Sequence, residues 1–188
     1  MKIHSRLVLF TVILIALATL CKFFFGPSLD WSGFSPVIAI ALFSGFMIQQ
    51  KNFSFLLPLV ALIASDLLIH LLYINGRFDY AGFYAGQWKN YLILMSAVLI
   101  GWIFKGRNRP ALLAGGLIAP TVFFLVSNFN VWLASEVAYT KDVDGLMTCY
   151  AAGLPFYKNA VLSTLAFLPL IAALYNYLTR HRTAITMA

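Results

Sequence analysis

Six apolar runs fill most of the sequence and limit the folds that the chain can adopt. A helix needs about 20 mainly apolar residues to cross a hydrocarbon core of about 30 Å, and only helices and closed barrels satisfy the backbone hydrogen bonds there. The runs therefore predict an all-α fold, an integral membrane bundle of six transmembrane helices that forms one domain over residues 1–188. The expected helices cover residues 7–25, 34–48, 53–74, 88–104, 110–133 and 155–178.

The composition supports a lipid environment for this bundle. Hydrophobic residues make up 62% of the chain and charged residues 10%, whereas soluble domains contain about 45–50% and about 25%. The expected span over residues 34–48 is the shortest, at about 22 Å for about 15 residues. Ser35-Pro36 is a helix-start signal, so we expect a helix there that either crosses the membrane or is partly re-entrant.

The distribution of charge predicts the orientation. The net charge of +7 comes from basic residues scattered among the apolar runs, so we expect no nucleic-acid partner. With both termini in the cytoplasm, eight basic residues lie on the cytoplasmic side and five on the outer side, in accord with the positive-inside rule. The predicted outer loops, residues 26–33, 75–87 and 134–154, are also the longer ones. Because binding residues concentrate on loops, we expect recognition from the outer side.

Asp66 is the most costly residue in the predicted bundle. A carboxylate in mid-membrane costs roughly 2.5–3.5 kcal/mol on translocon scales, so it must face protein or water. His70 lies four residues later and projects from the same helix face. Two interpretations stay open: the pair binds a ligand or relays protons, or Asp66 has a structural role in which it accepts hydrogen bonds from neighbouring helices.

The outer part of the chain contains most of the candidate binding residues. Residues 132–159 combine aromatic rings with hydroxyl, amide and acidic groups, which is the usual make-up of small-molecule sites. Cys149 is either a small packing residue or a soft metal ligand, and its spacing from Cys21 predicts neither a disulfide nor a zinc site. We expect no metal and no cofactor. The substrate-binding candidates are Asp66, Asn128, Trp132, Tyr139, Thr140, Cys149, Tyr150 and Asn159.

The chain contains no GxSxG, HExxH or P-loop motif, so we expect that it is not an enzyme and that any energy input comes from a partner or a gradient. Gly115 and Ala119 form a small-xxx-small pair that lets another helix approach closely.

Several stretches resemble a family of small, functionally unassigned bacterial membrane proteins, which in turn looks like the substrate-binding S components of energy-coupling-factor (ECF) vitamin transporters. The resemblance covers nearly the whole chain. It rests on Gly33 to Val37, Leu57-Pro58-Leu59, Ser65-Asp66-Leu67, Ser127-Asn128-Phe129 with Trp132, Thr140 to Leu146, Cys149-Tyr150, and Leu154-Pro155-Phe156 with Asn159.

This resemblance implies a six-helix binding protein of the bacterial cytoplasmic (inner) membrane, with both termini in the cytoplasm and a vitamin-sized ligand held near the outer face. S components usually dock on an energising ECF module through an alanine pair spaced by three residues in the first helix. Here Ala16 and Ala18 depart from that spacing. The leading hypothesis is therefore uptake of a small organic micronutrient. The alternatives are a membrane scaffold or assembly subunit that binds a helix through Gly115 and Ala119, and an intramembrane enzyme that uses Asp66 and His70.

Overall fold

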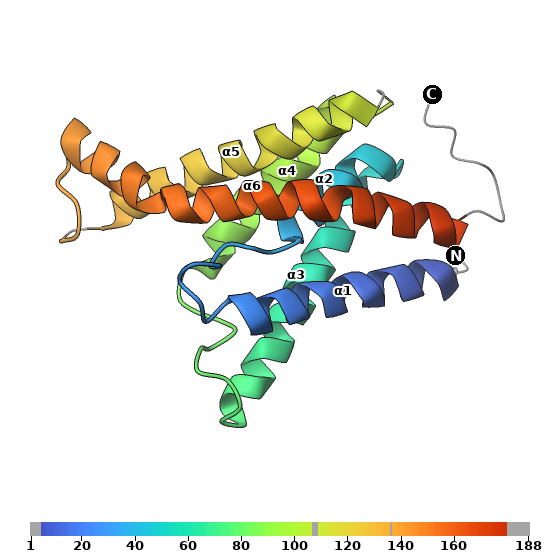
Figure 1. The fold of residues 1–188 in the computed structure, drawn as a ribbon, viewed down its shortest axis with the longest axis horizontal. Helices are drawn as coiled ribbons and strands as arrows, with labels where there is room; N and C mark the ends of the chain where they lie inside the picture. Colours follow the sequence, from blue (N-terminus) through green and yellow to red (C-terminus); the bar gives the residue numbers. More distant parts are fainter. Residues whose placement is uncertain (1–4, 107–108, 136, 180–188) are drawn as a thin grey trace.

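The computed structural model describes residues 5–106, 109–135 and 137–179, and within these ranges it contains six α-helices and no strand. Successive helices run back and forth, so the bundle has two ends (Figure 1). The all-α fold expected from the apolar runs is confirmed. The helices are α1 (Ser5–Phe25), α2 (Val37–Met47), α3 (Lys51–Ile74), α4 (Gln87–Ile103), α5 (Arg109–Ala134) and α6 (Val143–Thr179).

Four of these helices, α1, α3, α5 and α6, are long and apolar enough to cross a membrane. The outer surfaces of these helices carry large exposed hydrophobic side chains, among them Val12, Leu117 and Leu170, as lipid contact requires. The structure thus contains the six expected helices, and four of them are candidate membrane spans. Helix α2 has 11 residues and reaches about 16 Å, against a hydrocarbon core of about 30 Å.

Helix α2 is the centre of the bundle. All nine residues from Ile38 to Phe46 are buried, and α2 packs against α3, α4, α5 and α6. A helix that is apolar on every side is stable only when it is surrounded. Its neighbours in the chain supply that surrounding, so α2 does not need the length of a membrane span.

Two glycines bring the backbones of α2 and α4 into contact. A Cβ atom on Gly45 would lie 2.1 Å from the carbonyl oxygen of Val98, and one on Gly101 would lie 2.4 Å from that of Leu42. Both neighbours are backbone atoms of regular helices and cannot move aside cheaply. Small residues are the means by which membrane helices approach closely, and here they join the central helix to α4.

The predicted small-residue pair in α5 also packs within the chain. A Cβ atom on Gly115 would meet the Leu42 side chain of α2 at 3.2 Å, and Ala119 is fully buried. Gly115 thus packs against a side chain of α2, and close approach of a second helix at Ala119 stays a prediction.

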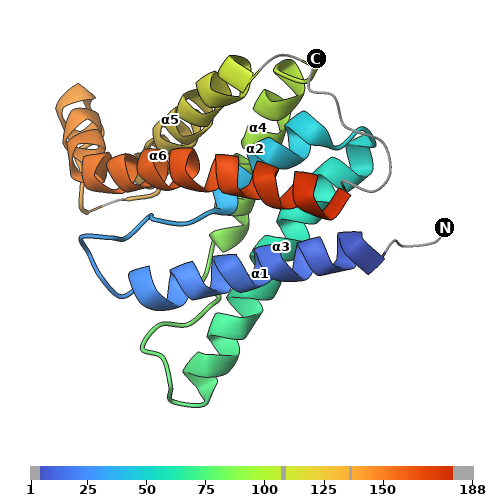
Figure 2. The same cartoon turned by 45° about the vertical axis from the view of Figure 1, so that its right-hand side comes forward.

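Helix α6 begins at Val143 and not at Pro155, so the expected loop over residues 134–154 was too long. Asp142 caps the helix: its Oδ1 accepts hydrogen bonds from the Gly145 amide at 2.8 Å and from the Thr140 hydroxyl at 2.7 Å. The Thr140 hydroxyl, followed by the Gly145 amide, lowers the pKa of Asp142, because both donate to the carboxylate. The sequence pattern predicts a helix start at Pro155, but Pro155 lies inside α6. Figure 2 shows the first turns of α6 bent away from the rest, as an internal proline permits.

The two ends of the bundle differ. The first turn of α1 lies beside the end of α6, where Arg6 Nη1 donates to the Leu178 carbonyl at 3.3 Å. The three longer connectors lie on the opposite side, to the left in Figure 1. We call this side the loop end; its connectors are residues 26–36, 75–86 and the described part of 135–142.

The contact between α2 and α4 predicts that Gly101→Ala destabilises the fold. Overpacking costs typically about 1–3 kcal/mol, which exceeds the gain in helix propensity of about 0.8–1.0 kcal/mol. Gly116→Ala is the matched control, because a Cβ atom there meets side-chain methyl groups and no backbone: those of Leu165 and Leu168 at 3.3 Å and that of Thr164 at 3.9 Å. Thermal unfolding of the purified variants in detergent measures both effects. Equal melting temperatures for the two variants would contradict the packing described above.

Candidate functional site

An ion pair between the partly buried Lys22 and the buried Asp66 joins α1 to α3. Lys22 Nζ lies 2.5 Å from Asp66 Oδ1 and also donates a hydrogen bond to Ser65 Oγ at 2.7 Å. Asp66 is 6% exposed and Ser65 is fully buried. Taking two charges out of water is costly, and their attraction offsets this cost only if the remaining hydrogen-bonding capacity is used. Asp66 therefore needs donors on its second oxygen.

Helix α4 provides those donors. Gln87 Nε2 donates to Asp66 Oδ2 at 2.9 Å, and the Tyr91 hydroxyl donates to the same oxygen at 2.5 Å. Both oxygens of the carboxylate are thus hydrogen-bonded, and one side chain cross-links three helices. We call this group the polar cluster; its members are Lys22, Ser65, Asp66, Gln87 and Tyr91.

The connector between α3 and α4 lies directly on the polar cluster. Gln87 Nε2 donates to the Gly82 carbonyl at 3.2 Å, and Gln87 Oε1 accepts from the Tyr84 amide at 3.1 Å. A Cβ atom on Gly82 would lie 2.0 Å from the Asp66 carbonyl oxygen. Only glycine allows this approach, so Gly82 and Gln87 together fix the loop over the carboxylate.

His70 lies one helical turn from Asp66, but its ring packs against Phe83 and Tyr73, with centroids 5.5 Å and 6.1 Å apart. His70 Nδ1 is buried and has no hydrogen-bond partner among the described residues. The hydrogen bonds recorded for the Asp66 carboxylate come from Lys22, Gln87 and Tyr91. The structural interpretation of Asp66 therefore holds, since neighbouring helices donate to it. A role in ligand binding stays a prediction.

Asn159 holds the connector between α1 and α2. Its Nδ2 donates to the carbonyls of Asp30 at 2.8 Å and of Ser32 at 2.9 Å, and its side chain is 2% exposed. Gly33 has a φ of +87°, and a Cβ atom on it would lie 3.0 Å from the Phe156 carbonyl oxygen. The connector is thus fixed against α6.

The other predicted binding residues also lie at the loop end, in the corner where the end of α5 meets the start of α6. Trp132 Nε1 donates to the Thr140 carbonyl at 2.8 Å, and the Tyr150 hydroxyl donates to the Leu125 carbonyl at 3.0 Å. Cys149 Sγ contacts the Asn128 carbonyl at 3.4 Å. These contacts hold the two helices together. The remaining two side chains belong to the same region: Asn128 donates to the Phe124 carbonyl at 2.9 Å, and Tyr139 is half-buried.

The eight candidates therefore fall into three places: Asp66 in the polar cluster, Asn159 at the α1–α2 connector, and the rest in the α5–α6 corner. The described residues contain no group of three or more His, Cys, Asp or Glu that is able to hold a metal ion. Lys22, Gln87 and Tyr91 were not selected from the sequence. One sequence feature does point to the Lys22–Asp66 pair: a lysine and an aspartate occur in two separate apolar runs. Charges inside a membrane usually pair with one another.

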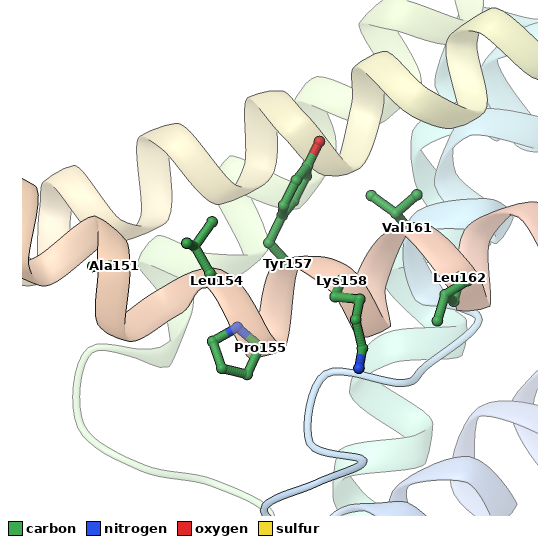
Figure 3. Close-up of a pocket in the computed structure, with 7 residues that line it drawn as sticks. All are labelled: Ala151, Leu154, Pro155, Tyr157, Lys158, Val161 and Leu162. Carbon is green, nitrogen blue, oxygen red and sulfur yellow. The ribbon is translucent and has the colours of Figure 1, made fainter.

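An open hollow of about 690 Å³ lies along α6 on both sides of Pro155, and it is lined by mostly exposed residues of this one helix. Figure 3 shows that the Tyr157 side chain reaches toward α5 while Lys158 extends toward the α1–α2 connector. The Tyr157 hydroxyl lies 2.8 Å from Thr121 Oγ1 of α5. Lys158 is the charged residue of the lining, which is otherwise mostly apolar. The lining residues are Ala151, Leu154, Pro155, Tyr157, Lys158, Val161 and Leu162.

The fold and the buried polar cluster define an all-helical protein whose longest helices suit a membrane. The model of a family of unknown function, DUF6580, matches residues 1–185, and the chain belongs to that family. The expected membership in a family without an assigned function is thus confirmed. No curated protein matched the sequence, and no solved structure matched it either.

The polar cluster predicts that Lys22→Met is strongly destabilising, because it leaves the Asp66 carboxylate buried without its counter-charge. Removal of one partner of a buried ion pair costs about 3–5 kcal/mol. The double variant Lys22→Met/Asp66→Leu is expected to recover most of this loss. Denaturant unfolding in detergent measures the free energies, with Lys89→Met as the control lysine, expected within about 0.5 kcal/mol of the unmodified protein. A double variant no more stable than Lys22→Met would show that the two charges do not depend on each other.

Proposed function

We propose that the protein is a membrane uptake protein of the ECF S-component type. In this proposal it resides in a bacterial cytoplasmic membrane with both termini in the cytoplasm. It binds a small organic micronutrient, a vitamin or a precursor, at the loop end from outside and carries it inward. The sequence resemblance to S components and the excess of basic residues on the proposed cytoplasmic side support this assignment.

The observation that carries the proposal is the hollow on α6 beside the fixed α1–α2 connector. It is open on one side, and its volume of about 690 Å³ is that of small-molecule sites, about 300–1,000 Å³. Its lining joins apolar surface from Leu154, Pro155 and Leu162 to the ammonium group of Lys158. Such a lining suits a molecule with an apolar body and a negatively charged group.

Pre-formed connectors add to this support. Asn159 binds two carbonyls of the α1–α2 connector, and Gln87 binds the α3–α4 connector. A loop that is already ordered loses little conformational entropy when it contacts a ligand. The loop end therefore has the rigidity of a recognition surface, whereas the connectors at the opposite end are short.

In this proposal the protein does not draw its energy from the shared ECF module, on which S components usually dock. Ala18 is fully buried in the bundle and Ala16 is exposed on the other side of α1. Helix α1 therefore does not present the two alanines together on its outer face. This arrangement favours uptake without the shared energising module.

Ligand binding by the purified full-length protein tests the proposal. We expect at least one member of a panel of vitamins and their precursors to raise the melting temperature in detergent, since a ligand at 100 times its Kd adds about 2.7 kcal/mol of stability. Lys158→Ala is expected to weaken binding of that compound by about tenfold or more, because a charge-assisted hydrogen bond is lost. Lys89→Ala is the control at a lysine outside the hollow. Absence of any thermal shift, together with absence of any co-purified compound, would overturn the proposed function.

A further inference from the structure

We propose that the end of the bundle opposite the loop end binds the headgroup of an anionic phospholipid between Lys51 and Lys105. We call this end the turn end, because the connection between α2 and α3 there is a short turn, residues 48–50. It lies to the right in Figure 1. The inference goes beyond the proposed uptake function and does not depend on it. It follows from the distribution of charge and from the contacts of the two lysines.

Charge is separated between the two ends of the bundle. The acidic residues that the structure describes lie at the loop end or in the polar cluster, and they are Asp30, Asp66, Asp79, Asp142 and Asp144. The turn end carries Arg6, Lys51 and Lys105, and all three are exposed. The described part of the turn end is therefore a positive surface without an acidic side chain of its own. Such a surface is complementary to an anionic partner.

Lys105 closes the end of the central helix α2. Its Nζ donates a hydrogen bond to the Ile48 carbonyl at 2.7 Å, and a cation is favourable at the end of a helix, where carbonyl groups are free. An ammonium group has three N–H donors, and this contact uses one of them. Because Lys105 is exposed, a ligand at the surface is able to accept a hydrogen bond from another.

Trp102 places Lys51 beside Lys105. Lys51 Nζ lies 5.7 Å from the centre of the Trp102 ring, which is within the range of a cation–π contact. The Lys105 amide donates to the Trp102 carbonyl at 3.2 Å, so these two residues share one turn at the end of α4. Ile48, which Lys105 contacts, lies three residues before Lys51. The two ammonium groups therefore belong to one small surface.

The indole ring of Trp102 is held in place from the protein side. Its Nε1 donates to Ser54 Oγ at 3.1 Å, and its ring meets Phe55 edge to face with centroids 5.0 Å apart. The Ser54 carbonyl accepts from the Ser44 hydroxyl of α2 at 2.7 Å. The start of α3 is thus fastened to both α2 and α4. A surface that is already ordered loses little conformational entropy when a headgroup binds.

An anionic phospholipid suits this surface better than a free anion does. Tryptophan and lysine together are typical of the membrane boundary, where the indole lies at the level of the headgroups and the ammonium group reaches water. Basic pockets between membrane helices bind anionic headgroups. The phosphodiester of such a lipid accepts hydrogen bonds from both lysines. Exposed apolar side chains on the same two helices, Leu56 of α3 and Ile103 of α4, are available to its acyl chains.

Two single-tryptophan reporters of the full-length protein test the site. One keeps Trp102, the other keeps Trp88 at the loop end, and the other three tryptophans of each are replaced by Phe. Each reporter is reconstituted in bilayers of phosphatidylcholine that contain increasing amounts of phosphatidylglycerol. Bromine atoms on the acyl chains of either lipid quench a nearby tryptophan. The two quenching curves give the preference of each reporter's surroundings for phosphatidylglycerol.

We expect a preference of about tenfold or more at Trp102 and of about twofold or less at Trp88, because each basic residue adds roughly a fivefold attraction to an anionic lipid surface. In the Trp102 reporter, Lys51→Gln/Lys105→Gln is expected to remove this preference. Arg77→Gln/Lys89→Gln removes the same charge at the loop end and is expected to keep it. Equal preferences at the two reporters, or a preference that survives replacement of both turn-end lysines, overturns the proposal.

The unmodified protein keeps the test decisive if the reporters do not fold. Native mass spectrometry in detergent compares how much phosphatidylglycerol and phosphatidylcholine it retains at equal concentrations. Lys51→Gln is expected to weaken phosphatidylglycerol binding by about fivefold, and Arg77→Gln is the control expected to leave it unchanged; equal binding by the two variants overturns the proposal. Inorganic phosphate is added as a competitor. Displacement of the lipid by phosphate alone would show a simple anion site and overturn the assignment to a phospholipid.

Discussion

The structure depends on the need to accommodate one carboxylate in an apolar bundle. Asp66 is buried, and each of its oxygens accepts hydrogen bonds from other helices. The same contacts bring the end of α1 to α3, fix the start of α4, and seat the α3–α4 connector on Gly82. Because a buried charge is tolerated only with partners in place, the polar cluster specifies how three helices are arranged at the loop end.

The rest of the bundle is held together by apolar packing, which depends on the size of the side chains and not on charge. Helix α2 is too short to span a bilayer but is apolar on all sides, and the long helices surround it. Gly45 and Gly101 let α4 approach until backbones touch, and Gly115 admits the Leu42 side chain. A central apolar helix and a polar cluster near one end make the two ends of the protein different. The proposed binding surface lies at the end that holds the longer connectors.

The sequence predicted the features that arise from local pattern. Long apolar runs identified the helices, and Gly115 identified a packing contact with Leu42 of α2. The start of α6 was missed because Pro155 resembles a first-turn proline, while the true cap, Asp142, lies in a polar stretch typical of a loop. The partners of Asp66 were missed for another reason. The spacing of the sequence pairs Asp66 with His70, and nothing in that spacing shows that α1 and α4 both meet α3 at residue 66. Such long-range pairings follow from packing, which local periodicity does not encode.

Lys22 and Asp66 form an ion pair inside the bundle, and the arrangement of α1, α3 and α4 at the loop end depends on it. Solid-state NMR of the full-length protein in lipid bilayers tests it most directly, with ¹⁵N-labelled lysine and ¹³C-labelled aspartate. The structure predicts a through-space correlation between the Lys22 ammonium nitrogen and the Asp66 carboxylate carbon at neutral pH, absent from Lys22→Met. A spectrum in which that correlation is missing at neutral pH would contradict the account.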